Sequence, residues 1–302
     1  MKNLVIQTID GVSFAMREAH TFPFLHEYGE VFCVFAQNDS GNISFGVNRN
    51  GVRRFIKVAG AKTAESCISP AAAVENLRRA VPVYEALAHP NLIRLTAHFS
   101  AEDLYVTVFD WVQGDCLFDY WNFEEYAKNP GSLSPRERFR ALPCEKKLAA
   151  FQVIFDFLCL TESKKYTAVD FYDGSILYDF QNDVTAICDI DFFCRGSVSN
   201  TQGDAFWGTP RLKAPEEYLH GATVDHITNV FTCGALLFHF FGSFSEEEIQ
   251  KMYREKAFFP CRRKTWTLSE AHYQIACKAV MPEKAQRYRS LREFTSLWIA
   301  AT

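Results

Sequence analysis

The sequence predicts an α+β fold, with a strand-rich first part and a larger, mainly helical second part. Three short apolar runs rich in β-forming residues lie at 31–35, 43–47 and 52–58, and such runs are typical of strands. Runs of strands followed by runs of helices indicate an α+β architecture rather than alternating βαβ units. The long segments of helical composition all come after Trp111, at 144–160, 228–241, 245–253 and 268–280.

One helix is expected within the strand-rich part, at 70–87. This segment is rich in Ala, Leu, Arg and Glu, and Pro70 suits a first helical turn. Pro82 lies inside the segment and should kink the helix.

The expected strands pair as hairpins. Asn50-Gly51 is the strongest short hairpin signal in the chain, so the runs on either side of it should be antiparallel neighbours. The remaining strands are expected at 92–95 and 104–109, and a short pair lies within the helical part at 176–178 and 184–188.

The pattern changes near 111–113, and this change predicts a bilobal chain. We expect residues 30–111 to form a small lobe with an antiparallel sheet and one helix, and residues 112–302 to form a larger, mostly helical lobe. Residues 1–29 are expected to be an N-terminal extension that packs on the small lobe. Clefts between lobes are favoured ligand sites, so we expect the ligand there.

Composition narrows the class of protein. The 302 residues are 48% hydrophobic and include 28 Phe, which is ample for a buried core. A net charge of −4 indicates neither a nucleic-acid nor a membrane partner. The chain has no run of about 20 apolar residues and no signal-peptide pattern at its start, so we expect a cytoplasmic protein. The ten Cys include no CxxC pair, which favours reduced core thiols over a zinc site.

Phosphoryl transfer requires a cation on the phosphates, metal-binding carboxylates and a carboxylate that orients the nucleophile. Lys57 is the candidate cation, because it stands inside the apolar strand 55–59. The alternative is an edge-strand lysine that faces solvent.

Four carboxylates flank the short strand pair of the second part. Asp170 and Asp173 precede the pair, whereas Asp189 and Asp191 follow it, so all four can converge on one spot. Clustered carboxylates repel unless a metal or protons neutralise them. Turn chemistry is the alternative; it accounts well for Asp173 but poorly for Asp189.

A motif between 208 and 217 carries a family resemblance. Gly208-Thr209-Pro210 and Ala214-Pro215-Glu216 resemble the Gly-Thr-Pro…Ala-Pro-Glu segment of serine/threonine protein kinases. Segments 89–92 and 229–234 resemble the turn after the small-lobe helix and the central large-lobe helix of that family. The resemblance covers about residues 30–300. It is to bacterial serine/threonine protein kinase-like proteins of the protein-kinase-like superfamily.

The resemblance implies a role for each candidate. Lys57 would contact the ATP phosphates, Asp170 would be the catalytic-loop aspartate, and Asp189 would bind magnesium. Arg287 would form a buried structural ion pair with Glu216. The nucleotide base and ribose would be met by Phe109 as gatekeeper, by Asp110 and Trp111 of the hinge, and by Asp115.

The chain also departs from the family pattern. Val169 stands where many kinases carry Arg, which puts control by phosphorylation in doubt. Ser175 replaces the metal-binding Asn, so the implied magnesium ligands are Asp189 and Ser175, with Asp173 and Asp191 beside them. The Asp189-Ile190-Asp191 triplet replaces Asp-Phe-Gly and resembles aminoglycoside phosphotransferases. Asn229 replaces a helix-start Asp but can still accept hydrogen bonds.

The small lobe departs from the pattern in two places. Its phosphate loop holds a single glycine, so phosphate contacts would rest on the backbone N–H groups of 39–42, namely Asp39, Ser40, Gly41 and Asn42. The glutamate expected to pair with Lys57 falls near Ala80, and Glu75 is the candidate that we favour.

The chain retains Lys57, Asp170 and Asp189, so the sequence favours an active enzyme that uses ATP and Mg²⁺. We expect a serine/threonine kinase with a protein or peptide substrate. The first alternative is a small-molecule kinase of the aminoglycoside or choline type, supported by the Asp-Ile-Asp triplet. The second is a pseudokinase that binds without turnover, supported by Ser175 and the glycine-poor loop.

Overall fold

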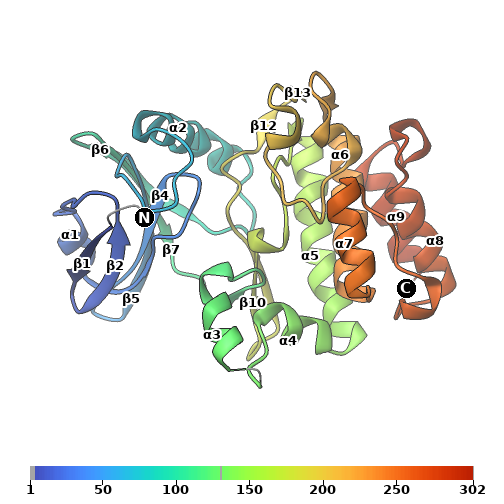
Figure 1. Cartoon of the computed structure of the whole chain (residues 1–302), viewed down its shortest axis with the longest axis horizontal. Helices are drawn as coiled ribbons and strands as arrows, with labels where there is room; N and C mark the ends of the chain where they lie inside the picture. Colours follow the sequence, from blue (N-terminus) through green and yellow to red (C-terminus); the bar gives the residue numbers. More distant parts are fainter. Residues whose placement is uncertain (1–3, 130, 302) are drawn as a thin grey trace. The chain divides into compact units, whose positions relative to one another are not determined.

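Two units make up the chain in the computed structural model, which describes residues 4–129 and 131–301 (Figure 1). The first unit holds 4–88, 92–113 and 120–124, and the second holds the other described residues. The first is built around an antiparallel five-stranded sheet with a helix, and the second is more helical. This arrangement confirms the α+β class predicted from the sequence.

The sheet of the first unit has the strand order β3-β4-β5-β7-β6, and every neighbouring pair is antiparallel. Arg49 pairs with Val52 across Asn50 and Gly51, whose φ angles of 53° and 84° are those of a two-residue hairpin turn. The predicted hairpin is therefore confirmed. The five strands are β3 (Glu30–Phe35), β4 (Asn42–Arg49), β5 (Val52–Ala59), β6 (Leu95–Ala101) and β7 (Leu104–Asp110).

The strand predicted at 92–95 is wrong in its bounds, because β6 begins at Leu95 and runs to Ala101. Its residues alternate between partly buried and exposed positions, as expected of an edge strand with one face towards solvent. Thr96, His98 and Ser100 interrupt its apolar character, so an apolar run was the wrong signal to follow there.

Helix α2 (Pro70–Ala86) packs against β5, β6 and β7 (Figure 1). The Ser69 hydroxyl caps its start by accepting a hydrogen bond from the Ala72 N–H at 3.2 Å. The helix continues through Pro82 as a single element, and its buried face includes Leu77, Ala80 and Tyr84.

The segment for which no element was predicted folds into the first unit. Strands β1 (Val5–Ile9) and β2 (Val12–Met16) form a hairpin, and α1 (Leu25–Tyr28) follows. Phe14, Met16 and Phe22 from this segment belong to the same apolar core as strands β3, β4 and β5. An Asp-Gly pair at 10–11 forms the turn, which is the signal that could have located this hairpin.

The second unit consists mainly of helices. Its centre is α6, which is buried along most of its length and packs against α8 and α9 (Figure 1). Gly234 permits the close approach, because a Cβ there would lie 2.8 Å from side-chain atoms of Ala279 and Val280. The helices are α4 (Pro135–Ala141), α5 (Cys144–Ser163), α6 (His226–Phe241), α7 (Glu246–Glu255), α8 (Glu270–Ala279) and α9 (Leu291–Ala300), while α3 (Phe123–Lys128) begins in the first unit.

The described residues of the second unit also form three small sheets. The predicted strand pair is present as β10 and β11. The sheets are β8 (Asp115–Cys116) with β10 (Ile176–Asp179) and β11 (Val184–Ile187), β9 (Tyr166–Thr167) with β12 (Cys194–Arg195), and β13 (Val198–Ser199) with β14 (Thr223–Val224). Within the described residues, no helix combines the length and apolar character needed to span a bilayer.

Candidate active site

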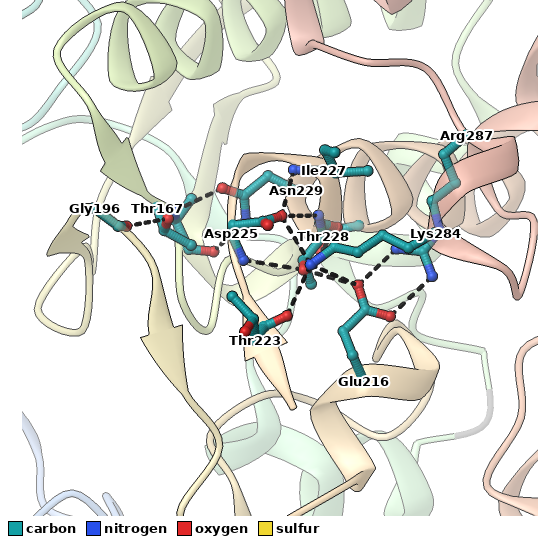
Figure 2. A network of polar contacts seen from close by, with 12 residues as sticks. Thr167, Gly196, Glu216, Thr223, Asp225, Ile227, Thr228, Asn229, Lys284 and Arg287 are labelled. Atoms are coloured by element: carbon teal, nitrogen blue, oxygen red, sulfur yellow. Dashed lines mark hydrogen bonds and ion pairs between the residues drawn. The ribbon is translucent and has the colours of Figure 1, made fainter. Parts of the chain in front are cut away.

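The loop that carries Asp170 is clamped to α6. Asn229 accepts a hydrogen bond from the Ala168 N–H and donates one to the Ala168 carbonyl, both at 2.8 Å (Figure 2). The Thr167 hydroxyl adds a bond of 2.5 Å to the Gly196 carbonyl. Because α6 is buried, this clamp fixes the backbone two residues before Asp170. It also confirms that Asn229 accepts hydrogen bonds at its helix start.

Asp170 and Asp189 share an uncommon backbone conformation. Their φ angles are 59° and 52°, in the left-handed region that residues other than glycine seldom occupy. Such strain is concentrated at functional sites, where the surrounding structure holds it in place. For Asp189 that support is visible, since the next residue, Ile190, is fully buried and its carbonyl accepts from Phe193 N–H at 3.1 Å.

Ser175 and Asp189 lie on adjacent segments. The Cys188 N–H donates to the Ser175 carbonyl at 2.9 Å, directly before Asp189. Ser175 is completely buried, and its hydroxyl has no hydrogen-bond partner among the residues that the structure describes. A buried hydroxyl of this kind is costly unless something satisfies it. Asp189 itself is exposed and Asp191 is partly buried.

Three of the four predicted carboxylates act on Tyr172. Burial raises the pKa of the Tyr172 phenol well above its usual range, and the charges of Asp189, Asp170 and Asp173 raise that pKa further. The Tyr172 ring lies against Gly174, where an added Cβ would be 2.3 Å from a ring carbon. Carboxylates from both sides of the β10–β11 pair therefore influence the pKa of one buried phenol.

Asp173 differs from the other candidates because its carboxylate is already engaged. It is completely buried, one oxygen accepts from Arg211, and the other lies 3.1 Å from His239 Nε2. Burial by itself would raise the pKa of this carboxyl, but His239 and Arg211 outweigh that effect and lower it. These contacts describe an internal ion pair, and the assignment of Asp173 as a magnesium ligand stays a prediction.

The Gly-Thr-Pro…Ala-Pro-Glu segment is anchored by the predicted ion pair. Arg287 donates to both oxygens of Glu216, at 2.6 and 2.9 Å, and the side chain of Arg287 is fully buried (Figure 2). The Thr228 hydroxyl at the start of α6 adds a bond of 2.8 Å to Glu216. Burial tends to raise the pKa of Glu216, but these donors lower it. The predicted buried pair of Glu216 and Arg287 is confirmed.

A narrow pocket of the second unit opens beside Asp170. Lys213 lies on its wall and is buried, and its amino group donates to the Phe206 carbonyl and, at 3.3 Å, to the Asp204 carbonyl. Burial lowers the pKa of Lys213 and raises that of Glu217 to about 7. Sequence reasoning did not single out Lys213, Glu217, Arg211 or His239. The pocket is lined by Asp170, Phe171, Gly208, Thr209, Leu212, Lys213, Glu217 and Thr232.

Lys57 lies in the first unit, on the middle strand of the sheet. Strand β5 pairs with β4 on one side and β7 on the other, and Lys57 is only 7% exposed. The alternative of an edge-strand lysine facing solvent is therefore wrong. Glu75 is half exposed and forms its ion pairs with Arg79, at 2.8 Å, and Arg78, at 4.0 Å. These contacts give no support to its assignment as the partner of Lys57.

The predicted phosphate loop folds against the start of α2. Asp39 accepts from Cys67 N–H at 3.0 Å through its carbonyl, and Ser40 is partly buried. Gly41 has a φ of 78°, and a Cβ there would lie 3.0 Å from the Ala73 Cβ. The amide oxygen of Asn42 is buried and has no hydrogen-bond partner within the described chain. Phosphate binding by this loop stays a prediction.

The residues predicted to bind the base and the ribose make the following contacts within the protein. Phe109 is fully buried with its ring 4.8 Å from that of Tyr84. Asp110 forms ion pairs with Arg54, at 3.0 Å, and Arg94, at 2.6 Å. The Trp111 N–H donates to the Arg53 carbonyl at 3.4 Å. Asp115 belongs to the second unit, where it pairs with Arg138 at 2.7 Å.

Comparison with protein-family models finds no match to this chain, and comparison with curated proteins finds none either.

Proposed function

We propose that this protein is an ATP- and Mg²⁺-dependent phosphotransferase with a protein-kinase-like fold, acting on serine or threonine of a protein substrate. The order of elements supports the fold: a five-stranded antiparallel sheet with one helix precedes a mainly helical unit that carries a small strand pair between α5 and α6. The buried pair of Glu216 and Arg287 supports it further, because the sequence motif implied that contact across 71 residues.

One observation carries the proposal. Asp170 and Asp189 both occupy strained left-handed conformations, and both act electrostatically on Tyr172. Strained acidic residues that share one neighbourhood are characteristic of catalytic and metal-binding sites.

Two residues support a bound magnesium ion in this proposal. Asp189 supplies an exposed carboxylate, and Ser175 supplies a buried hydroxyl with no partner among the described residues. Oxygen ligands of this kind suit Mg²⁺, which usually binds one or two carboxylates together with phosphate oxygens. When bound, magnesium supplies positive charge that offsets the charge developing on the transferred phosphoryl group.

The chain's own residues then have separate tasks. Asp170 accepts a hydrogen bond from the acceptor hydroxyl, orients it towards the phosphorus and takes its proton late in the transfer. Lys57 holds phosphate oxygens of the nucleotide. Asn229 holds the backbone before Asp170 in place through its two hydrogen bonds to Ala168.

A pseudokinase is the second candidate, and one observation favours it. Both oxygens of Asp173 are engaged by Arg211 and His239, which reduces the carboxylates available to a second metal ion. A protein with a single weak metal site would bind nucleotide and turn it over slowly or not at all.

Incubation with γ-labelled ATP and Mg²⁺, with and without a generic protein substrate, tests the proposal. We expect label on protein, and we expect Asp170→Asn and Asp189→Asn each to lower the rate by about 10²–10⁴-fold. Asp103→Asn is the matched control, because Asp103 is exposed on the turn between β6 and β7. ATP binding without any transfer supports the pseudokinase, and transfer that survives both substitutions rejects the assigned roles.

A further inference from the structure

The 208–217 segment is tied to the rest of the second unit by a buried cluster centred on Arg211. Its guanidinium donates to Asp173, which stands in the turn just after the Asp170 loop. Asp173 is also held by His239 of α6 at 3.1 Å. Three parts of the chain that are distant in sequence therefore meet at one carboxylate.

The cluster is sheltered and charged. The side chain of Asp173 is completely inaccessible, and those of Arg211 and His239 are 15% and 12% exposed. One oxygen of the Asp173 carboxyl accepts from the Arg211 guanidinium, and the other lies 3.1 Å from His239 Nε2. Separating such a pair is costly because it leaves one charge buried and unpaired.

Arg211 also shapes its own segment. Its second terminal nitrogen donates to the Thr209 hydroxyl at 3.0 Å, and its guanidinium lies over the Phe118 ring at 4.1 Å. The Leu212 N–H donates to the Thr209 carbonyl at 2.9 Å, which closes a turn around Arg211. The turn thus rests on one guanidinium that contacts an anion, a hydroxyl and an aromatic face.

Residue 169, directly before Asp170, is a valine and carries no positive charge. Val169 is buried in an apolar cluster with Phe206 and Val224. A phosphate on a neighbouring serine or threonine would therefore meet apolar side chains at this point, whereas Arg211 already has an internal carboxylate as its partner.

We propose that Arg211 is a positioning residue that Asp173 and His239 hold in place. We propose further that it orders segment 208–217, which lines the pocket beside Asp170 and would there meet the acceptor, without phosphorylation of the chain. This inference rests on the proposed function and adds its regulation: an internal aspartate takes the place of an activating phosphate. Arg211 acts through the segment's backbone and does not itself contact the reacting atoms.

The first test compares the purified chain before and after treatment with a broad phosphatase, with intact mass confirming that no phosphate remains. We expect the same initial rate of transfer to the protein substrate and no lag phase. A lag, or a rate that recovers only as the chain becomes phosphorylated, overturns the proposal.

The second test measures hydrogen exchange in the 203–219 peptide together with steady-state kinetics. In Arg211→Met we expect faster exchange in this peptide and a KM for the protein substrate raised by about tenfold or more, with the KM for ATP changed by less than about twofold. Arg211→Lys keeps the charge without the forked geometry and should fall between wild type and Arg211→Met. Arg262→Met is the control, since Arg262 is an exposed arginine paired with Glu248.

Unchanged exchange and an unchanged KM for the protein substrate in Arg211→Met would reject the positioning role. If Arg211→Met does not fold, Arg211→Lys decides the question by the same two readouts. If wild type transfers no phosphate at all, the proposed function fails, but the exchange measurement still decides whether Arg211 orders the segment.

Discussion

The acidic segments 168–175 and 188–191 lie on either side of one strand pair, yet Asp173 of the first and Asp189 of the second differ in exposure to solvent. Asp173 is completely buried, and each of its oxygens has a protein partner. Asp189 is exposed, adopts a left-handed conformation and follows a segment bonded to Ser175. The first arrangement stabilises the fold, whereas the second keeps a charged group accessible at a cost in backbone strain. We therefore expect Asp173 to contribute to stability and Asp189 to contribute to the proposed chemistry.

Substitution of the two aspartates should separate these roles in opposite directions. Asp173→Asn leaves Arg211 buried without its counter-charge, so we expect the free energy of unfolding to fall by about 3–5 kcal/mol. Asp189→Asn should change it by less than about 0.5 kcal/mol, because Asp189 is exposed and asparagine tolerates left-handed backbone. Denaturant unfolding of both variants makes the comparison, and equal losses of stability would remove the distinction.

Loss of the Asn229 clamp should lower the stability by an intermediate amount. Asn229→Ala removes both bonds to Ala168 and leaves a buried N–H and a buried carbonyl without partners. We expect a loss of about 1–3 kcal/mol in unfolding free energy, together with a lower rate of transfer because the Asp170 loop loosens. Denaturant unfolding and turnover measure the two effects. Gln274→Ala on α8 is the control, since Gln274 is exposed. A variant as stable and active as wild type would show that the clamp is dispensable.

The titration of Glu217 gives an expected effect of similar size. Burial raises the pKa of Glu217 from 4.5 to about 7, so the folded state binds a proton that the unfolded state has released. Stability should therefore fall as pH rises from about 4.5 to about 7, by about 1–3 kcal/mol from this group. Glu217→Gln should flatten the dependence across that window, while Glu255→Gln at an exposed position should leave it unchanged. If the stability of Glu217→Gln still depends on pH across this window, other titratable groups cause the dependence.

Much of the fold could be predicted from local patterns in the sequence. The hairpin at Asn50-Gly51 and the long helical segments follow from turn chemistry and composition, which act over a few residues. The hairpin at Asp10-Gly11 had the same kind of signal and was overlooked. The bounds of β6 were wrong because its alternating polar residues mask a strand whose pairing with β7 stabilises it.

The candidate site was predictable where a motif fixes a long-range contact, and not elsewhere. The pair of Glu216 and Arg287 followed from the motif that contains Glu216. The environment of Asp173 did not, because its partners Arg211 and His239 lie 38 and 66 residues further along the chain. Whether a carboxylate is buried and paired depends on which side chains, distant in sequence, pack against it. The sequence near the carboxylate does not indicate those partners.

Thermal unfolding with ATP, alone and with Mg²⁺, tests most directly whether Asp189 is a metal-binding group at a nucleotide site. A ligand that binds only the folded state raises the unfolding temperature, so wild type should gain about 3 °C or more with ATP and Mg²⁺ together. In Asp189→Asn the gain from Mg²⁺ should disappear. The same magnesium-dependent gain in wild type and Asp189→Asn would contradict the account.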